Sequence, residues 1–267
     1  MEEEKKVYMD GYLETLLGSF KDAVHKKNTS VVIIIDGRSG MGKTTLSNQV
    51  SKYLYEDFKL ANVYFTPETF LDGLASAKQF SAHIFDEAML LSNRSTMTQI
   101  NRMIVQAMSM IRSKQIYVCF GVNSIFDLDR NLALSRADLL LHVYGDNLTD
   151  RGNFCAFFKP KGQEDRIKLL YLLGKKFYSY TKPKANFYGR FTTKFILDED
   201  EYEKKKQIGV NAFLRGETAT MTKHNLTEAR LVRYLHDVVK LTPEQISDIA
   251  EVSTRTIFNK LRTAREL

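Results

Sequence analysis

Apolar residues recur along the first half of the chain in two alternating patterns. Continuous apolar runs, such as residues 31–35, alternate with stretches in which apolar positions recur every three or four residues. These patterns predict strands at 31–36, 62–65, 82–85, 116–122 and 139–144, and helices at 10–27, 44–55, 95–114 and 126–135. A turn is expected at Pro67. Strands that are apolar on both faces and alternate with helices indicate a parallel sheet between helical layers.

The pattern changes from about residue 145. Short alternating runs predict antiparallel strands at 154–158, 167–173 and 191–197, added to the edge of the sheet. Residues 198–214 are charged and are expected to be helical. We therefore divide the chain into an α/β domain, a linker rich in Thr and small residues, and a small all-α domain. Their boundaries are 1–215, with a basic and aromatic β-rich insertion at about 145–197, then 216–225, and then 226–267.

A glycine-rich sequence follows the first predicted strand directly. Residues 37–44 read GRSGMGKT and match GxxxxGK[ST], between a strand and a helix as a phosphate-binding loop requires. Glycines let the backbone N–H groups surround a polyphosphate, and the following helix directs its positive end to the same anion. Lys43 is expected to bridge the β- and γ-phosphates and Thr44 to bind Mg²⁺. The expected ligands are ATP and Mg²⁺, held by Gly37, Ser39, Gly40, Met41, Gly42, Lys43, Thr44 and Thr45.

Two acidic residues directly follow the predicted strand at 82–85. Asp86 is expected to hold the Mg²⁺ shell, and the adjacent Glu87 to polarise the attacking water, which indicates hydrolysis. Asn123 ends a later strand, where additional-strand ATPases keep a γ-phosphate sensor. The alternative is a kinase, because the opening sequence DGRSG at residues 36–40 resembles small-molecule kinases of the uridine kinase type.

Several arginines are candidates for a finger that completes the site of a neighbouring subunit. Arg136, just before the last core strand, is the first choice, and Arg130 is the second. The others are Arg94, Arg102 and Arg112. A surface or salt-bridge role is the alternative for each of them.

The net charge of +7 is concentrated in one segment. Residues 159–194 hold ten basic residues against two acidic ones, interleaved with aromatic residues. Cations that follow phosphates and rings that stack on bases are typical of nucleic-acid binding. The predicted DNA contacts in this segment are Lys175, Lys176, Lys182, Lys184 and Arg190. The alternative is a β-rich segment with its aromatic residues in the core and its lysines in water.

Residues 226–267 predict three short helices. Thr242 is the expected N-cap of the middle helix, with Gln245 at the capping-box position, and Ser253 caps the next helix through Leu261. Residues 241–262 resemble the helix-turn-helix of sigma-like and resolvase-like DNA binders, with two departures, at Ser247 and Glu251. This resemblance implies DNA contacts from Thr254, Arg255, Asn259, Lys260 and Arg262. A helical hairpin for protein contacts is the alternative.

Residues 30–145 as a whole resemble the FtsK and HerA branch of P-loop ATPases, including Zot-like proteins of mobile elements. The motifs that carry this resemblance are DEA at 86–88, Arg94, IR at 111–112, Asn123 and RAD at 136–138. It implies a ring that moves DNA, with Lys43 and Thr44 as nucleotide ligands, Asp86 on magnesium, Glu87 as base, Asn123 as sensor and Arg136 acting in trans. Asn123 stands where the branch often has Gln.

We expect a cytoplasmic protein without a membrane contact, because no apolar run approaches the length of a membrane span and residues 1–11 are acidic. The main hypothesis is an ATPase that translocates or remodels duplex DNA for a virus, plasmid or transposon, as a ring or filament. The alternatives are a DNA-binding regulator or loader that ATP switches without translocation, and a small-molecule kinase.

Overall fold

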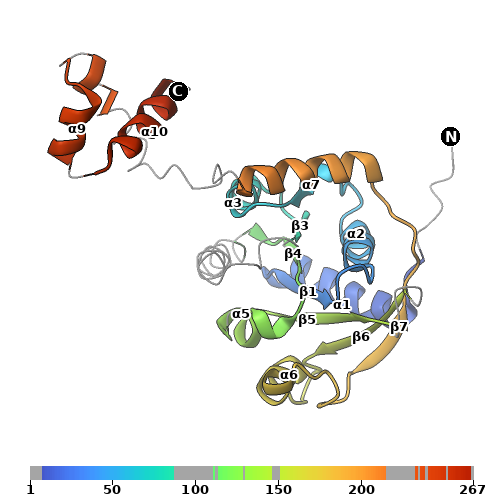
Figure 1. Cartoon of the computed structure of the whole chain (residues 1–267). Helices are drawn as coiled ribbons and strands as arrows, with labels where there is room; N and C mark the ends of the chain where they lie inside the picture. Colours follow the sequence, from blue (N-terminus) through green and yellow to red (C-terminus); the bar gives the residue numbers. More distant parts are fainter. Residues whose placement is uncertain are drawn as a thin grey trace, which may run out of the picture. The chain divides into compact units, whose positions relative to one another are not determined.

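The computed structural model of this chain describes residues 8–86, 111, 114–128, 130–145, 151–214, 232–233, 235–237, 240–250 and 252–265. The chain divides into two compact units, Met1–Thr218 and Ala219–Leu267. Figure 1 colours both units along the sequence. None of the helices in the described residues is both long and apolar enough to cross a bilayer.

The first unit is an α/β fold. Its strands are β1 (Val31–Gly37), β2 (Val63–Tyr64), β3 (Ala82–Asp86), β4 (Tyr117–Gly121), β5 (Leu139–Tyr144), β6 (Asn153–Phe158) and β7 (Phe187–Arg190). The α-helices among its described residues are α1 (Gly11–Lys27), α2 (Lys43–Leu54), α3 (Pro67–Ala75), α5 (Arg130–Ser135), α6 (Arg166–Gly174) and α7 (Glu199–Leu214). Its 3-10 turns are η1 (Leu60–Asn62), η3 (Ile125–Asp127) and η4 (Lys175–Phe177).

The seven strands that the structure describes form one sheet in the order β2-β3-β4-β1-β5-β6-β7. β2, β3, β4, β1 and β5 run parallel, and β6 and β7 continue the sheet with antiparallel pairing. β4 lies between β1 and β3, which is the additional-strand arrangement that the sequence predicts. Because parallel strands end at the same edge of the sheet, the residues that follow β1, β3 and β4 are brought together there.

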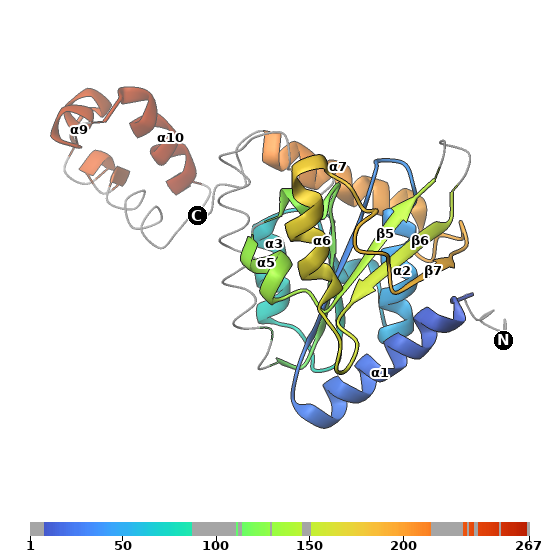
Figure 2. The ribbon, with the colours of Figure 1, turned by 90° about the horizontal axis from the view of Figure 1, so that it is seen from below.

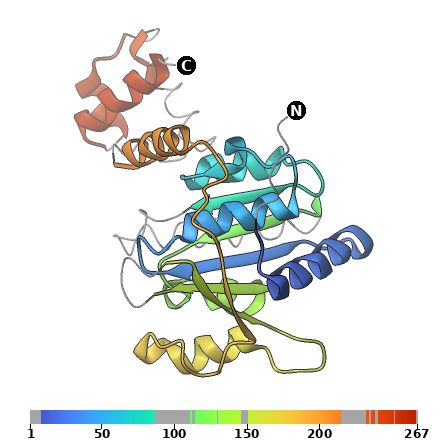
Figure 3. The ribbon, with the colours of Figure 1, turned by 90° about the vertical axis from the view of Figure 1, so that its right-hand side faces the viewer.

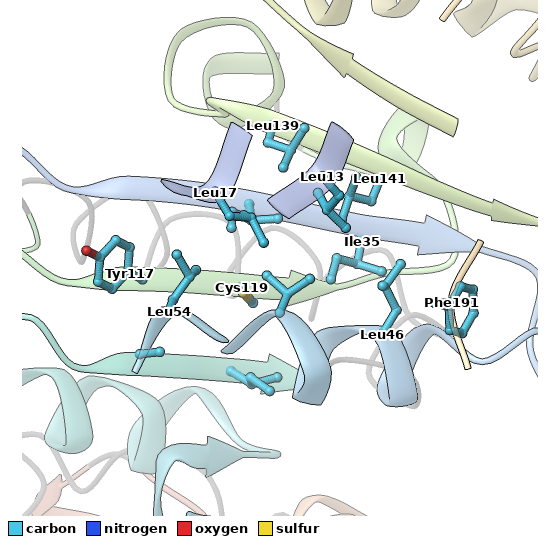
Figure 4. Packing of buried hydrophobic residues seen from close by; sticks show 14 of the residues in the cluster. Leu13, Leu17, Ile35, Leu46, Leu54, Tyr117, Cys119, Leu139, Leu141 and Phe191 are labelled. Carbon is cyan, nitrogen blue, oxygen red and sulfur yellow. The ribbon is translucent and has the colours of Figure 1, made fainter. Parts of the chain in front are cut away.

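Alternate residues of β1 face two separate cores. Val32 and Ile34 pack with α3, α5 and α6, whereas Ile33 and Ile35 pack with α1 and α2. Figure 2 shows these two helical layers on opposite faces of the sheet. Figure 4 shows part of the second core, in which Leu13 and Leu17 of α1 lie over the strands. The period-two alternation of a strand therefore explains why the apolar run of β1 has no polar face.

Several sequence predictions need comment. Residues 167–173 form α6 and not a strand, because Asp165 caps the helix and Ile167, Leu170 and Tyr171 share one buried face. The expected turn at Pro67 is the first residue of α3, which Thr66 caps. Most of the helix predicted at 95–114, and the linker predicted at 216–225, lie outside the described residues.

Residues 191–197 also do not form the predicted strand. The edge strand is β7, which ends at Arg190, and the chain then crosses α2 on its way to α7 (Figure 3). Gln49 of α2 donates hydrogen bonds to the carbonyl oxygens of Thr192 and Lys194, at 2.8 and 2.9 Å. Phe191 is buried in the same core. Backbone groups that a neighbouring strand would pair are therefore bound by a helix side chain.

The second unit contains α9 (Pro243–Ala250) and α10 (Thr254–Arg265), and residues 232–233 and 235–237 are also helical. Thr242 and Gln245 form the predicted reciprocal cap, with bonds of 2.9 and 3.3 Å. Ser253 accepts from the N–H of Thr256 at the start of α10. A small core joins these helices through Val232, Ile246, Ile257 and Leu261.

We expect Leu17→Ala to lower the free energy of unfolding by about 2–5 kcal/mol, because the Leu17 side chain is fully buried between α1 and the sheet. Leu173→Ala is the matched control, since Leu173 is also helical but 59% exposed, and its effect should stay within about 0.5 kcal/mol. Urea unfolding followed by circular dichroism measures both. Equal losses would contradict the docking of α1 on the sheet.

Candidate nucleotide site

The loop between β1 and α2 requires glycine at three positions. Gly37, Gly40 and Gly42 have φ values of 139°, 82° and 97°. A Cβ on Gly37 would lie 2.2 Å from the carbonyl oxygen of Val143 in β5, and a Cβ on Gly42 would lie 3.0 Å from the Phe191 ring. This left-handed backbone turns the loop tightly above the sheet and leads directly into the amino terminus of α2, where free N–H groups and the helix dipole favour an anion.

Lys43 is buried at the base of this loop, with 7% of its surface exposed. Its Nζ donates to the carbonyl oxygen of Gly37 at 2.7 Å and to Oδ1 of Asn123 at 3.2 Å. Burial lowers the pKa of the Lys43 ammonium, and the nearby Asp86 and Asp36 carboxylates oppose that shift. Among the described residues, these two acceptors bind two of the three N–H groups of the ammonium. The third N–H group can still bind an anion.

Asp86 and Thr44 meet at the edge of the sheet. Thr44 Oγ1 donates to Asp86 Oδ2 at 3.1 Å, and Asp86 is 7% exposed at the end of β3. The neighbouring strand provides room for this carboxylate, because a Cβ on Gly121 would lie 3.0 Å from Asp86 Oδ1. A hydroxyl and a carboxylate are ligands that suit Mg²⁺, which binds few protein groups and keeps several waters.

Asn123 lies beside the loop because β4 is the neighbour of β1. Its backbone oxygen accepts from the N–H of Gly37 at 3.3 Å, and its side chain contacts Lys43. The structure therefore brings together four of the residues that the sequence proposes, Lys43, Thr44, Asp86 and Asn123. Their roles in binding and hydrolysis remain predictions.

Three further members of the predicted loop set are placed differently. Met41 is 2% exposed and packs its side chain in the core below the loop, so only its backbone is available to a phosphate. Ser39 is exposed, and Thr45 is half-buried in the first turn of α2. Glu87 lies outside the described residues, as do Arg94, Arg102 and Arg112.

Arg136 lies at the amino-terminal ends of the parallel strands, opposite to the loop. It is exposed just before β5, which runs parallel to β1, whereas the loop follows the carboxyl end of β1. The length of β5, about 20 Å for a strand of six residues, separates the two edges. Arg136 cannot reach the loop of its own chain. Arg130, at the start of α5, is also exposed.

A buried carboxylate network lies under the loop, and sequence reasoning did not find it. Asp36 is fully buried, and its carboxylate accepts from the backbone N–H of Ile125 at 2.8 Å and from the Tyr180 hydroxyl. His142 Nδ1 lies 2.8 Å from Asp36 Oδ1, and the His142 ring stacks on Tyr180 with centroids 3.6 Å apart. The sequence signal is a polar residue inside each of two apolar strands, Asp36 in β1 and His142 in β5.

Sequence reasoning also missed Tyr202. Its hydroxyl donates to Asp86 Oδ2, the oxygen that Thr44 contacts. Tyr202 lies in the first half of a helix, where nearly all the other residues are charged, so the pattern indicated only a solvated helix.

The residues of this site fit a nucleoside triphosphate with Mg²⁺. A loop held in positive φ, a desolvated ammonium with an available donor, and a hydroxyl–carboxylate pair are the features that such a ligand requires. The model of the KAP family P-loop domain matches residues 10–259. The chain belongs to this family.

Two solved structures are remotely similar to this KAP domain. One is the replication initiator DnaA bound to AMPPCP and single-stranded DNA, with 12% identity, 98% of this chain and 90% of that chain covered, and a TM-score of 0.36. The other is a single-substitution variant of RuvB from Thermotoga maritima, with 13% identity, coverage of 94% and 84%, and a TM-score of 0.35. No curated protein matches this chain. The resemblance to the FtsK and HerA branch remains a prediction.

We expect Lys43→Ala to abolish binding of a fluorescent ATP analogue by this KAP domain, because the substitution removes the buried cation that faces the loop. Lys52→Ala is the matched control, since Lys52 lies on the same helix and donates to the carbonyl oxygen of Glu56 instead. Fluorescence titration of both variants measures the difference. Unchanged affinity in Lys43→Ala would show that the nucleotide does not occupy this loop.

Proposed function

We propose that this KAP domain is a magnesium-dependent ATPase that binds DNA and uses ATP hydrolysis to translocate or remodel it. The observation that carries the ATPase part is the convergence of Lys43, Thr44, Asp86 and Asn123 at one edge of the sheet. When bound, Mg²⁺–ATP supplies the phosphoryl group and a divalent charge. Lys43 binds the phosphates, Thr44 and Asp86 hold the cation, and Asn123 orients the γ-phosphate end.

Hydrolysis is favoured over transfer to a small acceptor by the residue that follows Asp86. In the sequence Glu87 directly follows Asp86, and a carboxylate can take a proton from water. The position of β4 supports the same proposal, because Asn123 lies 3.2 Å from Lys43 Nζ, as a residue that responds to the terminal phosphate must. We therefore assign Glu87 as the base and Asn123 as the sensor.

The basic segment, defined as residues 159–194, supports DNA binding. Lys175, Lys176, Lys182, Lys184 and Arg190 are all exposed. The aromatic residues of the segment divide into two groups. Tyr171 and Phe191 are core residues, as the alternative interpretation held, whereas Phe177 and Tyr178 are 75% and 57% exposed among the lysines of η4. Exposed rings next to exposed ammonium groups suit a contact with bases and phosphates.

One face of α10 supports a second DNA contact. Arg255, Phe258, Asn259 and Arg262 are exposed, and their spacing of i, i+3, i+4 and i+7 places them on one side of the helix. Thr254 and Lys260 are half-buried. We propose that α9 and α10 act as a helix-turn-helix whose second helix reads the major groove.

The turn between α9 and α10 has its own support. Ser247, which departs from the usual Ala, donates from Oγ to the carbonyl oxygen of Val252 at 2.5 Å. Thr254 Oγ1 lies 3.4 Å from Ser247 Oγ. The serine at position 247, where alanine is usual, thus stabilises the turn. Glu251, the other departure, lies outside the described residues.

We also propose that copies of the chain associate head to tail. Arg136 lies at the amino-terminal ends of the strands and the loop lies at their carboxyl-terminal ends, so a heterologous contact can present Arg136 of one copy to the loop of the next. Such contacts generate rings or filaments. Arg136 then stabilises charge on the neighbour's γ-phosphate as hydrolysis proceeds.

We expect replacement of Lys175, Lys176, Lys182 and Lys184 by Ala to weaken DNA binding and to reduce the stimulation of ATP turnover by DNA. Each phosphate neutralised contributes about 0.7–0.9 to the slope of log affinity against log salt, so the loss of four lysines should lower the slope by up to about 3–4. Fluorescence anisotropy with duplex and single-stranded DNA at several salt concentrations measures the slope, and phosphate release measures turnover.

The matched control removes four exposed lysines elsewhere, Lys26, Lys27, Lys59 and Lys204. It changes net charge equally and should leave the slope unchanged. An unchanged slope in the first variant would contradict DNA binding by the basic segment. Strong stimulation of turnover by DNA supports translocation, whereas nucleotide-dependent DNA affinity with slow turnover would favour an ATP-switched regulator.

We expect Arg136→Ala to lower ATP turnover at least tenfold without weakening ATP binding, since a finger acts on the neighbour's nucleotide. Mixing this variant with Lys43→Ala subunits should restore part of the activity, because each type supplies what the other lacks. Phosphate release from mixtures at several ratios measures the recovery. Arg130→Ala, six residues away, is the comparison. No recovery in mixtures that assemble would exclude Arg136 as a trans residue.

A further inference from the structure

Tyr202 is buried in the first turn of α7, whose other residues face solvent. It is 2% exposed, while its neighbours Glu201 and Glu203 are exposed. Its ring lies between Phe65 and Phe195, with centroids 5.2 Å from each and nearly perpendicular planes of 78° and 82°. Edge-to-face contacts of this kind fix a ring in place. The hydroxyl of Tyr202 is thus held at one position.

The Tyr202 hydroxyl is held next to the carboxylate of the proposed magnesium site. The Tyr202 hydroxyl donates to Asp86 Oδ2, which also accepts from Thr44. Burial first, and then the charge of Asp86, raise the pKa of Tyr202, so the phenol stays neutral and acts as a donor. A carboxylate has about four lone-pair sites, and Tyr202 and Thr44 occupy sites on Oδ2 only. Among the described residues no group donates to Oδ1, which leaves that oxygen for the water shell of a cation.

The helix that carries Tyr202 is anchored along the same face. Lys205 donates from Nζ to the carbonyl oxygens of Leu60 and Val63, at 2.8 and 2.6 Å. Gly209 lies against Phe65, where a Cβ would come within 2.8 Å of the Phe65 Cβ. Positions 202, 205 and 209 lie on one side of α7. These contacts fix α7 beside β2, so the tyrosine cannot swing away from Asp86 without moving the helix.

We propose that Tyr202 is a positioning residue of the magnesium site. It fixes the Asp86 carboxylate in the orientation that faces Thr44, so that the cation binds to a site that is already ordered. A preorganised ligand loses less conformational freedom on binding, which raises affinity. The proposal deepens the nucleotide site and rests on that part of the proposed function. It does not depend on DNA binding or on assembly.

The test is Tyr202→Phe in the full chain, because phenylalanine keeps the ring between Phe65 and Phe195 and removes only the hydroxyl. Affinity for a fluorescent ATP analogue is titrated in EDTA and at increasing Mg²⁺. In EDTA the affinity should be unchanged, because Lys43 and the loop are intact. The Mg²⁺ concentration for the half-maximal gain in affinity should rise about tenfold to a hundredfold, the effect of losing one hydrogen bond to a charged group.

Tyr117→Phe is the matched control. Tyr117 is fully buried at the start of β4, and its hydroxyl has no hydrogen-bond partner among the described residues. Its removal should leave both titrations unchanged. Thermal melting checks that both variants fold.

Three results would overturn the proposal. An unchanged Mg²⁺ requirement in Tyr202→Phe would show that Asp86 is ordered without the tyrosine. An equal loss of affinity in EDTA and in Mg²⁺ would show a general structural role. A lower Mg²⁺ requirement would show that the hydroxyl competes with the cation. Failure of the unmodified chain to bind the analogue at all would instead refute the nucleotide site itself.

Discussion

The site depends on the position of β4 between β1 and β3. With β4 in that place, the residues that follow three strands meet at one edge, and Asn123 contacts the Lys43 ammonium that extends from α2. Glycine at position 121 provides space for the Asp86 carboxylate from the adjacent strand. Exchange of β4 with β3 would leave every motif intact in the sequence and would move Asn123 away from Lys43. Strand order is therefore the constraint on which the chemistry rests.

Two carboxylates near the loop differ in their surroundings and therefore in their roles. Asp36 is fully buried, with donors from a backbone N–H, a histidine and a tyrosine. These bonds satisfy a buried charge and join β1, β5 and the turn after β4, so Asp36 supports the loop from below. Asp86 is slightly exposed, and the hydroxyls of Thr44 and Tyr202 both donate to its Oδ2. Of these two carboxylates, Asp86 is the one that can serve a cation.

The chain between β7 and α7 connects the sheet edge with the centre of the site. Phe191 lies beside Gly42, the residue before α2. Gln49 of α2 binds the backbone of Thr192 and Lys194, and the Tyr202 hydroxyl donates to Asp86. The basic segment ends in this same stretch, at residue 194. The surface proposed for DNA and the site proposed for ATP are thus parts of one continuous packed structure, whereas α10 belongs to a separate compact unit.

The sequence by itself determined the phosphate loop, the parallel strands and the caps of α9 and α10, because these features depend on local backbone geometry and on the periodicity of apolar residues. It failed at residues 167–173, where an apolar run is compatible with a strand or a helix, and at residues 191–197, where Gln49 of α2 binds the backbone in place of a neighbouring strand. It also gave no sign of Tyr202, because one tyrosine in a charged helix has no pattern. The tertiary structure alone decided that this tyrosine meets Asp86 and that Asp36 meets His142 and Tyr180, since residues 106 to 144 positions apart become neighbours only when the sheet and its covering helices pack together.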